Sequence, residues 1–121
     1  MVTGVVYEGK FKENLIHGQG MVQWPDSSSY KGSFKLGLKH GSGIYKNPKK
    51  GVIYEGEWVE GKREGKGRLT LKDGSVYEGE FKSGLKEGKG KLVYPSGNYY
   101  DGIWKGGKKE GDGIMKWQQD G

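Results

Sequence analysis

Residues 54–67 read YEGEWVEGKREGKG, and residues 77–90 read YEGEFKSGLKEGKG. The same pattern of tyrosine, aromatic and glycine residues begins at three further positions, Tyr7, Tyr30 and Tyr100. The five tyrosines are 23, 24, 23 and 23 residues apart. A fixed period of this length is typical of repeat proteins, in which each repeat is one supersecondary unit packed against its neighbours. The chain is therefore predicted to be a single array of five repeats.

The composition of the chain differs from that of an ordinary globular domain. Only 31% of its 121 residues are hydrophobic, 30% are charged and 25 are glycine. Such a composition alone is typical of disorder. Nineteen of the glycines, however, fall on four positions of the repeat when the tyrosine is counted as position 1: five at position 3, four at position 8, and five each at positions 12 and 14. This regularity indicates a folded array.

Each repeat contains two runs in which every second residue is aromatic, apolar or glycine. The first has an aromatic residue at position 1, glycine at position 3 and an aromatic residue at position 5, with charged residues such as Glu55 between them. The second covers positions 14, 16 and 18, as in Gly67, Leu69 and Leu71. This alternation predicts two strands with one aromatic face. Fourteen of the fifteen aromatic residues lie on that face, and Tyr99 is the exception.

Two kinds of turn are predicted to join these strands. GKREG (61–65) is expected to close the hairpin within a repeat, while KDGS (72–75) and PSGN (95–98) are expected to connect successive repeats. Position 8 is glycine in four repeats and Asn14 in the first, which predicts a left-handed backbone there, because asparagine tolerates positive φ better than most residues. The extra residue of the second repeat, in 47–51, predicts a wider loop.

The connections are too short to contain crossover helices, so each repeat is predicted to be a β-hairpin. The whole chain is then an all-β, open, elongated and twisted antiparallel meander of about ten strands, roughly 50 Å long at about 4.8 Å per strand. Glycines at positions 3 and 14 would let aromatic rings lie across bare backbone. The repeats are assigned to residues 7–29, 30–53, 54–76, 77–99 and 100–121, with 1–6 as the tail of a preceding repeat.

The pattern Y-E-G-x-[WF]-x-x-G-x-x-x-G-x-G resembles the MORN (membrane occupation and recognition nexus) repeat, and the resemblance runs from Tyr7 to about Trp117. It implies consecutive β-hairpins in an open, twisted sheet. MORN arrays occur in proteins that join membranes, in phosphoinositide kinases, in a lysine methyltransferase, in ciliary radial spokes and in cytoskeletal scaffolds. The resemblance therefore implies a binding or scaffolding surface, with any catalysis in another domain. The chain is expected to belong to a longer protein, with 118–121 in a turn that leads to a further repeat, or to rely on partners at both ends.

Two surfaces are candidates for binding. The aromatic face is expected to expose its rings and to bind an extended segment or helix of a protein partner, or a second copy of the array. The aromatic residues chosen for this role are Tyr54, Trp58, Tyr77, Phe81, Tyr100 and Trp104. Basic residues at positions 9 and 10 are expected to line one long edge, either as solubilising charge or in contact with acidic phospholipid or an acidic protein. They are Lys39, Lys62, Arg63, Lys86, Lys108 and Lys109.

Several functions are not expected from these residues. Nucleic acid is not expected, because base stacking needs aromatic and basic groups together and the rings are predicted to face away from the charges. His17 and His40 are interpreted as loop residues about 9.6 Å apart, too far to share a metal ion. GKREGKG lacks the spacing of a phosphate-binding loop, and the chain has no cysteine. No catalysis, cofactor, metal or small-molecule substrate is therefore predicted.

Three functions remain open. The first is a protein-interaction scaffold in a cytoskeletal or ciliary assembly. The second is a membrane-surface adaptor for acidic phospholipids, which the net charge of +6 permits. The third is a regulatory module of a larger enzyme, such as a phosphoinositide kinase or a lysine methyltransferase. Because no secretory leader is recognised and cysteine is absent, the expected location is intracellular: cytoplasm, cytoskeleton or cilium, or the cytoplasmic face of a membrane.

Overall fold

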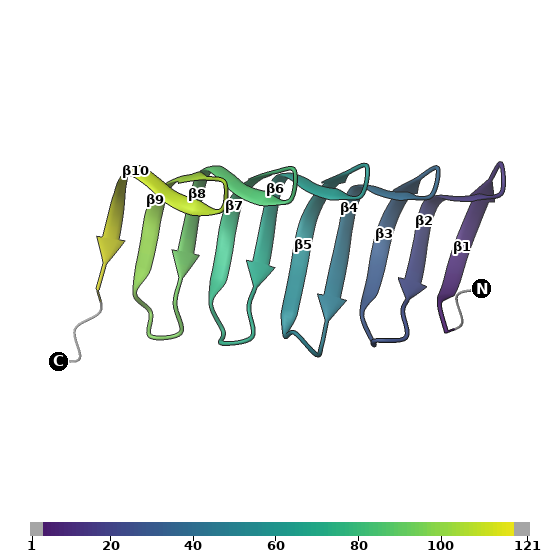
Figure 1. The fold of residues 1–121 in the computed structure, drawn as a ribbon, viewed down its shortest axis with the longest axis horizontal. Coiled ribbons are helices and arrows are strands. Elements are labelled where there is room, and N and C mark those ends of the chain that lie inside the picture. The colour runs from purple at the N-terminus through teal and green to yellow at the C-terminus, as the bar shows by residue number, and fades with distance from the viewer. Residues whose placement is uncertain (1–3, 118–121) are drawn as a thin grey trace.

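The computed structural model describes residues 4–117, which form one ten-stranded antiparallel sheet without a helix (Figure 1). Its strands are β1 (Val6–Lys12), β2 (Leu15–Gln23), β3 (Ser29–Lys35), β4 (Leu38–Asn47), β5 (Val52–Val59), β6 (Lys62–Thr70), β7 (Val76–Lys82), β8 (Leu85–Val93), β9 (Tyr99–Lys105) and β10 (Lys108–Lys116). Each strand pairs with its neighbours in sequence. The predicted all-β meander is confirmed, whereas the turn predicted for 118–121 lies outside the described residues.

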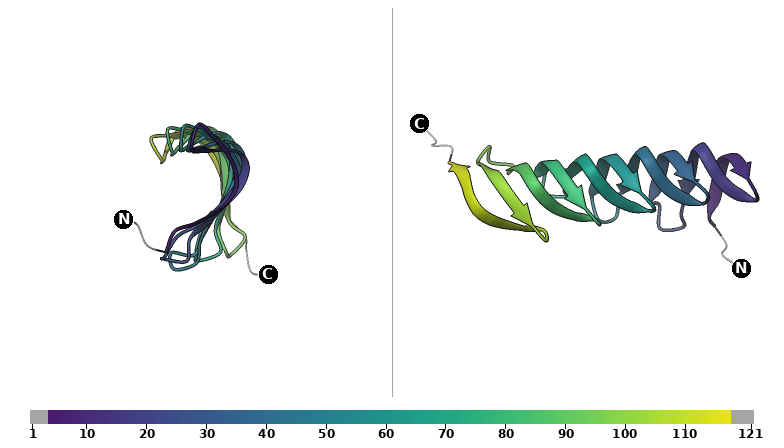
Figure 2. Two further views of the ribbon diagram at one scale, coloured as in Figure 1. Left: turned by 90° about the vertical axis from the view of Figure 1, so that its right-hand side faces the viewer. Right: turned by 90° about the horizontal axis from the view of Figure 1, so that it is seen from above.

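The sheet is a single layer that curves strongly across the strands. Viewed along its long axis, the strands follow a C-shaped arc with an inner and an outer face, and from above the array is elongated (Figure 2). Glycines at positions 3 and 14 face each other across the strands, as in the pairs Gly56–Gly67, Gly67–Gly79 and Gly79–Gly90. A row of paired glycines thus crosses the array, and glycine within strands is typical of sharp bends.

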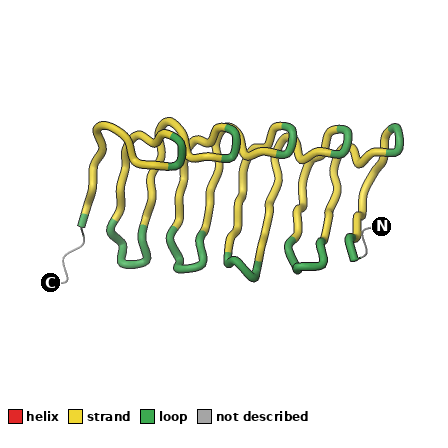
Figure 3. The backbone as a smooth tube through the Cα atoms, in the orientation of Figure 1, coloured by secondary structure: helices red, strands yellow, loops and turns green. Residues whose placement is uncertain are grey.

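The hairpin turn within each repeat has two residues, and these turns gather along one edge of the array (Figure 3). Between β5 and β6 the turn is Glu60–Gly61, with φ of 48° and 85°, as in a type I′ turn. The predicted turn over 61–65 is therefore wrong, because β6 begins at Lys62. Gly65, with φ of 74°, lies instead in a bulge of β6 where the register shifts. Glycine is favoured both in the turn and in the bulge because it adopts positive φ without strain. The sequence alone therefore does not show which of the two glycines lies in the turn.

The left-handed backbone predicted for position 8 is confirmed. Asn14 has a φ of 64°, and the glycines at this position in the other repeats have φ of 85° to 89°.

The loops between repeats lie along the opposite edge. KDGS and PSGN lie in two of these loops, as predicted, and the Ser75 amide donates to the Asp73 carboxylate at 2.8 Å. The wider loop predicted for the second repeat is wrong, because the extra residue lengthens the strands and only residues 48–51 separate β4 from β5. Buried Asn47 explains this, since its side chain donates to the Tyr45 hydroxyl at 3.2 Å and accepts from the Lys50 amide at 3.1 Å.

The hydrophobic core lies on the inner face, where side chains of neighbouring repeats cover one another. A single layer has no second sheet or helix to cover this face, so burial depends on the curvature. The buried apolar residues occupy positions 1, 5 and 16: Val22, Tyr30, Phe34, Tyr54, Trp58, Leu69, Tyr77, Phe81, Leu92, Tyr100 and Trp104.

Candidate functional site

A continuous row of ring contacts forms the floor of the inner face. We call this row, made of the tyrosines at position 1 and the Phe or Trp at position 5, the aromatic ladder. The Tyr54 ring meets Trp58 of its own repeat at 5.0 Å between centroids and Phe81 of the next repeat at 5.1 Å, both edge-to-face. Tyr30 and Tyr77 repeat this arrangement. Such pairs contribute about 0.5–1.5 kcal/mol beyond their buried area, so the ladder binds each repeat to the next.

The tyrosine hydroxyls anchor the ladder to the backbone. Tyr54 donates to the carbonyl of Glu57 and Tyr77 to that of Glu80, each at 2.9 Å. To reach this carbonyl the tyrosine ring must lie over the backbone of the paired glycines. A Cβ added to Gly79 would lie 2.5 Å from the Cα of Gly90 and 2.7 Å from the Tyr77 hydroxyl. The predicted placement of rings over bare glycine backbone is therefore confirmed.

The six aromatic residues proposed for partner binding belong to this buried ladder. Tyr77 is fully buried and Tyr100, the most exposed of them, is only 7% exposed. The prediction that these rings are exposed is wrong, because the curvature brings the rings of adjacent repeats into contact. Their role in partner binding stays a prediction, and a partner would meet first the side chains that cover them.

Basic side chains at position 10 lie directly on the ladder. Lys39 Nζ is 5.1 Å from the Trp58 ring centroid, and Lys86 Nζ is 5.2 Å from that of Trp104. Each cation also faces the tyrosine of its own repeat at up to 5.7 Å. We call this set the cation row: Lys39, Arg63, Lys86 and Lys109. Cation–π contacts contribute roughly 0.5–2 kcal/mol each, so these residues also stabilise the array.

This arrangement corrects the predicted basic edge. Four of the six basic residues lie over the rings, whereas Lys62 and Lys108 are exposed at the strand starts that follow the tight turns and face no described ring. The argument that rings and charges face apart is also wrong. Stacking on nucleic acid bases is disfavoured for another reason, which is that the rings of the ladder are buried.

The four cations differ in the hydrogen bonds that their side chains donate. Arg63 Nη2 donates to the Gly84 carbonyl at 2.6 Å, and Lys109 Nζ donates to the Tyr94 hydroxyl at 2.8 Å. The ammonium groups of Lys39 and Lys86 have no hydrogen-bond acceptor among residues 4–117. Burial lowers the pKa of both, and the charge of Arg63 lowers the pKa of Lys86 further. These two groups are half-buried donors directed at the space above the ladder.

That space is a groove along the inner face, which we call the inner groove. Around the third repeat it has a volume of about 460 Å³, with Lys39 and Arg63 beside Tyr54, Trp58 and Leu69. A second hollow of about 480 Å³ adjoins it and is lined by residues that include Trp24, Tyr45 and Lys39. In these hollows the groove combines an apolar floor with the cations Lys39 and Arg63. Lys86 and Lys109 continue the cation row over the rings of the fourth and fifth repeats.

The side chain at position 11 accepts a hydrogen bond from a backbone amide in the tight turn of the next repeat. The Glu64 carboxylate accepts from the Ser83 amide at 2.7 Å, and Glu87 accepts from the Gly106 amide at 2.8 Å. His17 and His40 do the same through Nδ1, at 3.3 and 3.4 Å. Both histidines lie in strands, so their interpretation as loop residues is wrong. Among the described residues no group of three or more potential ligands could hold a metal ion.

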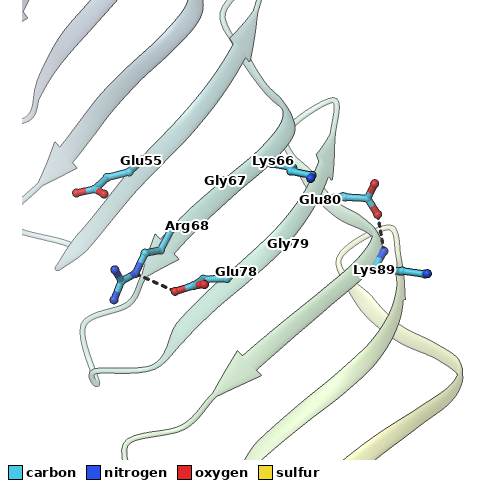
Figure 4. Close-up of a pocket in the computed structure, with 8 residues that line it drawn as sticks. All are labelled: Glu55, Lys66, Gly67, Arg68, Glu78, Gly79, Glu80 and Lys89. Carbon is cyan, nitrogen blue, oxygen red and sulfur yellow. Dashed lines mark hydrogen bonds and ion pairs between the residues drawn. The ribbon is translucent and has the colours of Figure 1, made fainter.

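The outer face carries a shallow depression of about 740 Å³ between β5 and β8 (Figure 4). Its floor is Gly67 and Gly79, and three acidic and three basic side chains surround it. Arg68 forms an ion pair with Glu78 at 3.4 Å. The glutamates of this face are exposed, and the side chains in Figure 4 do not converge on a common point. The balanced, solvated charges give this depression no evident ligand.

Comparison with known proteins agrees with this geometry. The family model of the MORN repeat matches residues 7–29, 30–52, 54–76, 77–99 and 100–121. The chain belongs to the MORN repeat family. MORN repeats are generally non-catalytic and interact with proteins or lipids. No helix in the described part of this array is long and apolar enough to cross a membrane.

Part of this MORN array is similar to alsin. Alsin of Homo sapiens and alsin of Mus musculus are each 36% identical to it over 65 residues, which is 50% of this chain and 4% of alsin. The chain thus spans a small fraction of the length of these relatives.

The buried tyrosines predict how the MORN array responds to alkali. Burial raises the pKa of Tyr30, Tyr54 and Tyr77 to about 12. Their contribution to stability is complete below the unfolded pKa of about 10 and is lost as the pH rises toward 12. Lys39 and Lys86 have a lowered pKa, so their charged form is disfavoured in the folded state. This destabilisation disappears as the pH rises toward the unfolded pKa of about 10.5. We therefore expect the melting temperature to hold or rise up to about pH 10 and to fall steeply above it.

This expectation is tested by circular dichroism melts combined with tyrosinate absorbance. The Tyr54→Phe variant cannot ionise at that position and should lose less stability between pH 10 and 12 than the parent chain. A melting temperature that falls before tyrosinate forms, or an identical alkaline loss in the variant, would contradict the assignment to the ladder tyrosines.

Proposed function

We propose that this MORN array is a non-catalytic scaffold that binds an extended, acidic segment of a partner protein in the inner groove. The observation that supports this is the cation row, in which one positive charge lies over the aromatic ladder in each of the second to fifth repeats. Lys39 and Lys86 keep unused donors there. Carboxylates would supply the missing acceptors, and charge-assisted hydrogen bonds are stronger than neutral ones.

The spacing of the row favours a particular backbone. Successive cations are two strands apart, which corresponds to about 9.6 Å. A polyproline II segment rises about 3.1 Å per residue, so every third side chain advances by about 9.3 Å. Acidic residues at every third position could therefore pair with successive cations. The residues between them would contact apolar side chains of the groove such as Val52 and Leu71.

A lipid surface fits this geometry less well. A flat bilayer cannot enter a curved groove, so it would meet mainly Lys62 and Lys108 among the six basic residues considered. Each basic residue near an anionic surface contributes about 1 kcal/mol, which leaves a weak attraction. The assembly served by the scaffold is proposed to be cytoskeletal or ciliary, and therefore intracellular, on the family resemblance alone. Imaging of the tagged full-length protein in cells tests that part.

The groove is tested with a fluorescent peptide of repeated Glu-Pro-Pro units and a Gln-Pro-Pro control peptide. We expect the acidic peptide alone to bind. Changing Lys39 and Lys86 together to glutamine should weaken its binding by about tenfold or more, because each lost hydrogen bond to a charged group is worth roughly 1.5–3 kcal/mol. The matched control changes Lys62 and Lys108 to glutamine, which removes the same charge outside the groove, and should weaken binding less than about threefold.

Circular dichroism must first show that both double variants stay folded. Equal weakening by the two pairs, or failure of the acidic peptide to bind the parent array, would reject the groove. Phosphatidylserine-containing vesicles provide the lipid comparison. Vesicle binding that depends on Lys62 and Lys108, without any peptide binding, would establish a membrane-surface adaptor in place of the proposed scaffold.

A further inference from the structure

Between the second and third repeats, the inner groove gathers three basic side chains over an apolar floor. Lys39, Lys50 and Arg63 line this part of the groove together with apolar residues such as Val52 and Leu71, around a volume of about 460 Å³. We call it the central hollow. Pockets for small molecules commonly measure about 300–1,000 Å³ and combine an apolar lining with a few convergent polar groups. The central hollow therefore has the size and the character of a small-molecule pocket.

Several polar groups of the central hollow are hydrogen-bond donors that lack an acceptor. The ammonium groups of Lys39 and Lys50 donate to no acceptor among residues 4–117. The Tyr45 hydroxyl accepts from the Asn47 side chain at 3.2 Å, and its own proton is donated to no described group. No acidic side chain of the described residues lines the hollow. The arrangement therefore lacks acceptors, which an anion would supply to all three donors.

The loop that carries Lys50 to the hollow is held in place by its own contacts. The Lys50 amide donates to the buried Asn47 side chain at 3.1 Å, and the Gly51 amide donates to the Pro48 carbonyl at 3.3 Å. A Cβ added to Gly51 would lie 2.8 Å from the Cα of Lys72, so this loop packs closely on the next one. The backbone of Lys50 is therefore positioned beside the hollow before any ligand binds, which lowers the cost of binding.

We propose that the central hollow binds a small amphiphilic carboxylate, a molecule with one carboxylate on a compact apolar body. Its carboxylate accepts hydrogen bonds from Lys39 and Lys50, and its apolar part covers Val52 and Leu71. A carboxylate carries a single negative charge, whereas a phosphate monoester carries about 1.5 to 2. Because charge is costly to bury over an apolar floor, the carboxylate is the better match for this hollow.

This site goes beyond the proposed scaffold function. The acidic partner segment is proposed to use successive cations along the groove, including Lys39 and Lys86, whereas the carboxylate uses the groove between two repeats only. Lys50 belongs to the central hollow and not to the cation row, so it separates the two ligands. Because both ligands use Lys39, the small carboxylate should exclude the partner segment from this part of the groove.

Isothermal titration calorimetry with octanoate tests the site. We expect one octanoate to bind per chain. The neutral analogue 1-octanol has a similar apolar body without the charge, and acetate has the charge without the body. Each should bind at least about tenfold more weakly than octanoate, because each lacks one of the two kinds of contact. Octylammonium should not bind, since its charge has the same sign as the three basic side chains.

Single substitutions then locate the bound carboxylate. Lys39→Gln and Lys50→Gln should each weaken octanoate binding by about tenfold, because each removes a hydrogen bond from a charged donor. Lys86→Gln is the matched control, which removes the same charge at position 10 two repeats after Lys39, and it should change the affinity by less than about twofold. Lys50 is exposed, so its substitution should leave the fold intact, and circular dichroism melts of all three variants check this.

The outcomes separate this site from the scaffold proposal. Octanoate binding that is weakened by Lys50→Gln supports the site even if the Glu-Pro-Pro peptide does not bind. If both bind, octanoate should raise the apparent dissociation constant of the peptide, and simultaneous binding without competition would overturn the site. Equal affinity for octanoate and 1-octanol, several equivalent octanoate molecules per chain, or equal weakening by Lys50→Gln and Lys86→Gln would overturn it as well.

Discussion

Gly79→Ala is expected to lower the free energy of unfolding by about 3 kcal/mol, although it adds a single methyl group. The new Cβ would lie 2.5 Å from the Cα of Gly90, 2.6 Å from the Lys89 carbonyl and 2.7 Å from the Tyr77 hydroxyl. Two of these neighbours are backbone atoms of the paired strand, which cannot rotate away as a flexible side chain could. Overpacking of this kind costs roughly 1–3 kcal/mol, occasionally more, and here it also displaces a ring of the ladder.

Gly84→Asn is the matched control, since it changes another glycine of the same repeat to a larger residue. Gly84 has φ of 86°, and nothing lies within 4 Å of an added Cβ. Asn14 occupies the same position in the first repeat with φ of 64°. The free energy of unfolding should therefore change by less than about 1 kcal/mol. Urea titrations of the two variants are compared, and similar losses would show that ring-over-glycine packing does not stabilise the sheet.

Phe81→Ala is expected to cost about 3–5 kcal/mol, the range measured for large aromatic truncations in cores. Phe81 is 3% exposed, and its ring lies 5.1 Å from that of Tyr54 and 5.2 Å from that of Tyr77. Arg63 covers it at 5.2 Å. Its removal interrupts the ladder in the middle of the array, so the two halves would lose their coupling.

Phe11→Ala changes the same residue type at the same position of a different repeat. Its ring is 63% exposed and makes a ring contact only with Tyr7 among residues 4–117, so its loss should cost less than about 1 kcal/mol. The free energies of unfolding of both variants are measured by urea titration. A loss for Phe11→Ala as large as that for Phe81→Ala would contradict stabilisation by the ladder.

Much of this fold could be predicted from the sequence because the same pattern of residues occurs in all five repeats. The alternation of rings and glycines specifies strands, the short connections specify hairpins, and Asn14 in place of glycine identifies a left-handed position. The tight turn was misplaced because Gly61 and Gly65 both adopt positive φ, one in a turn and the other in a bulge. Residue type alone does not distinguish these two structures.

The character of the site could not be predicted in the same way. Whether a ring such as Trp58 is exposed depends on the curvature of the whole sheet, to which every glycine pair contributes. The position of Lys39 over the rings follows from the two-residue turn, which pairs position 10 with the inward-facing position 5, as Lys39 with Phe34. One available signal was overlooked: position 10 is Ile16 in the first repeat, and an apolar residue at an otherwise basic position indicates that the side chain packs against the core.

Because of the strand order, the stability of the array and the length of its inner groove both depend on the number of repeats. Each strand pairs only with its sequence neighbours, and each ladder ring contacts only its own and the adjacent repeat. Stability should then grow by one fixed increment per repeat, as in a one-dimensional chain of coupled units. Inserting a second copy of 54–76 would lengthen the inner groove by one cation and one apolar step. The repeat number would thus set both the thermodynamic stability of the array and the length of partner it can bind.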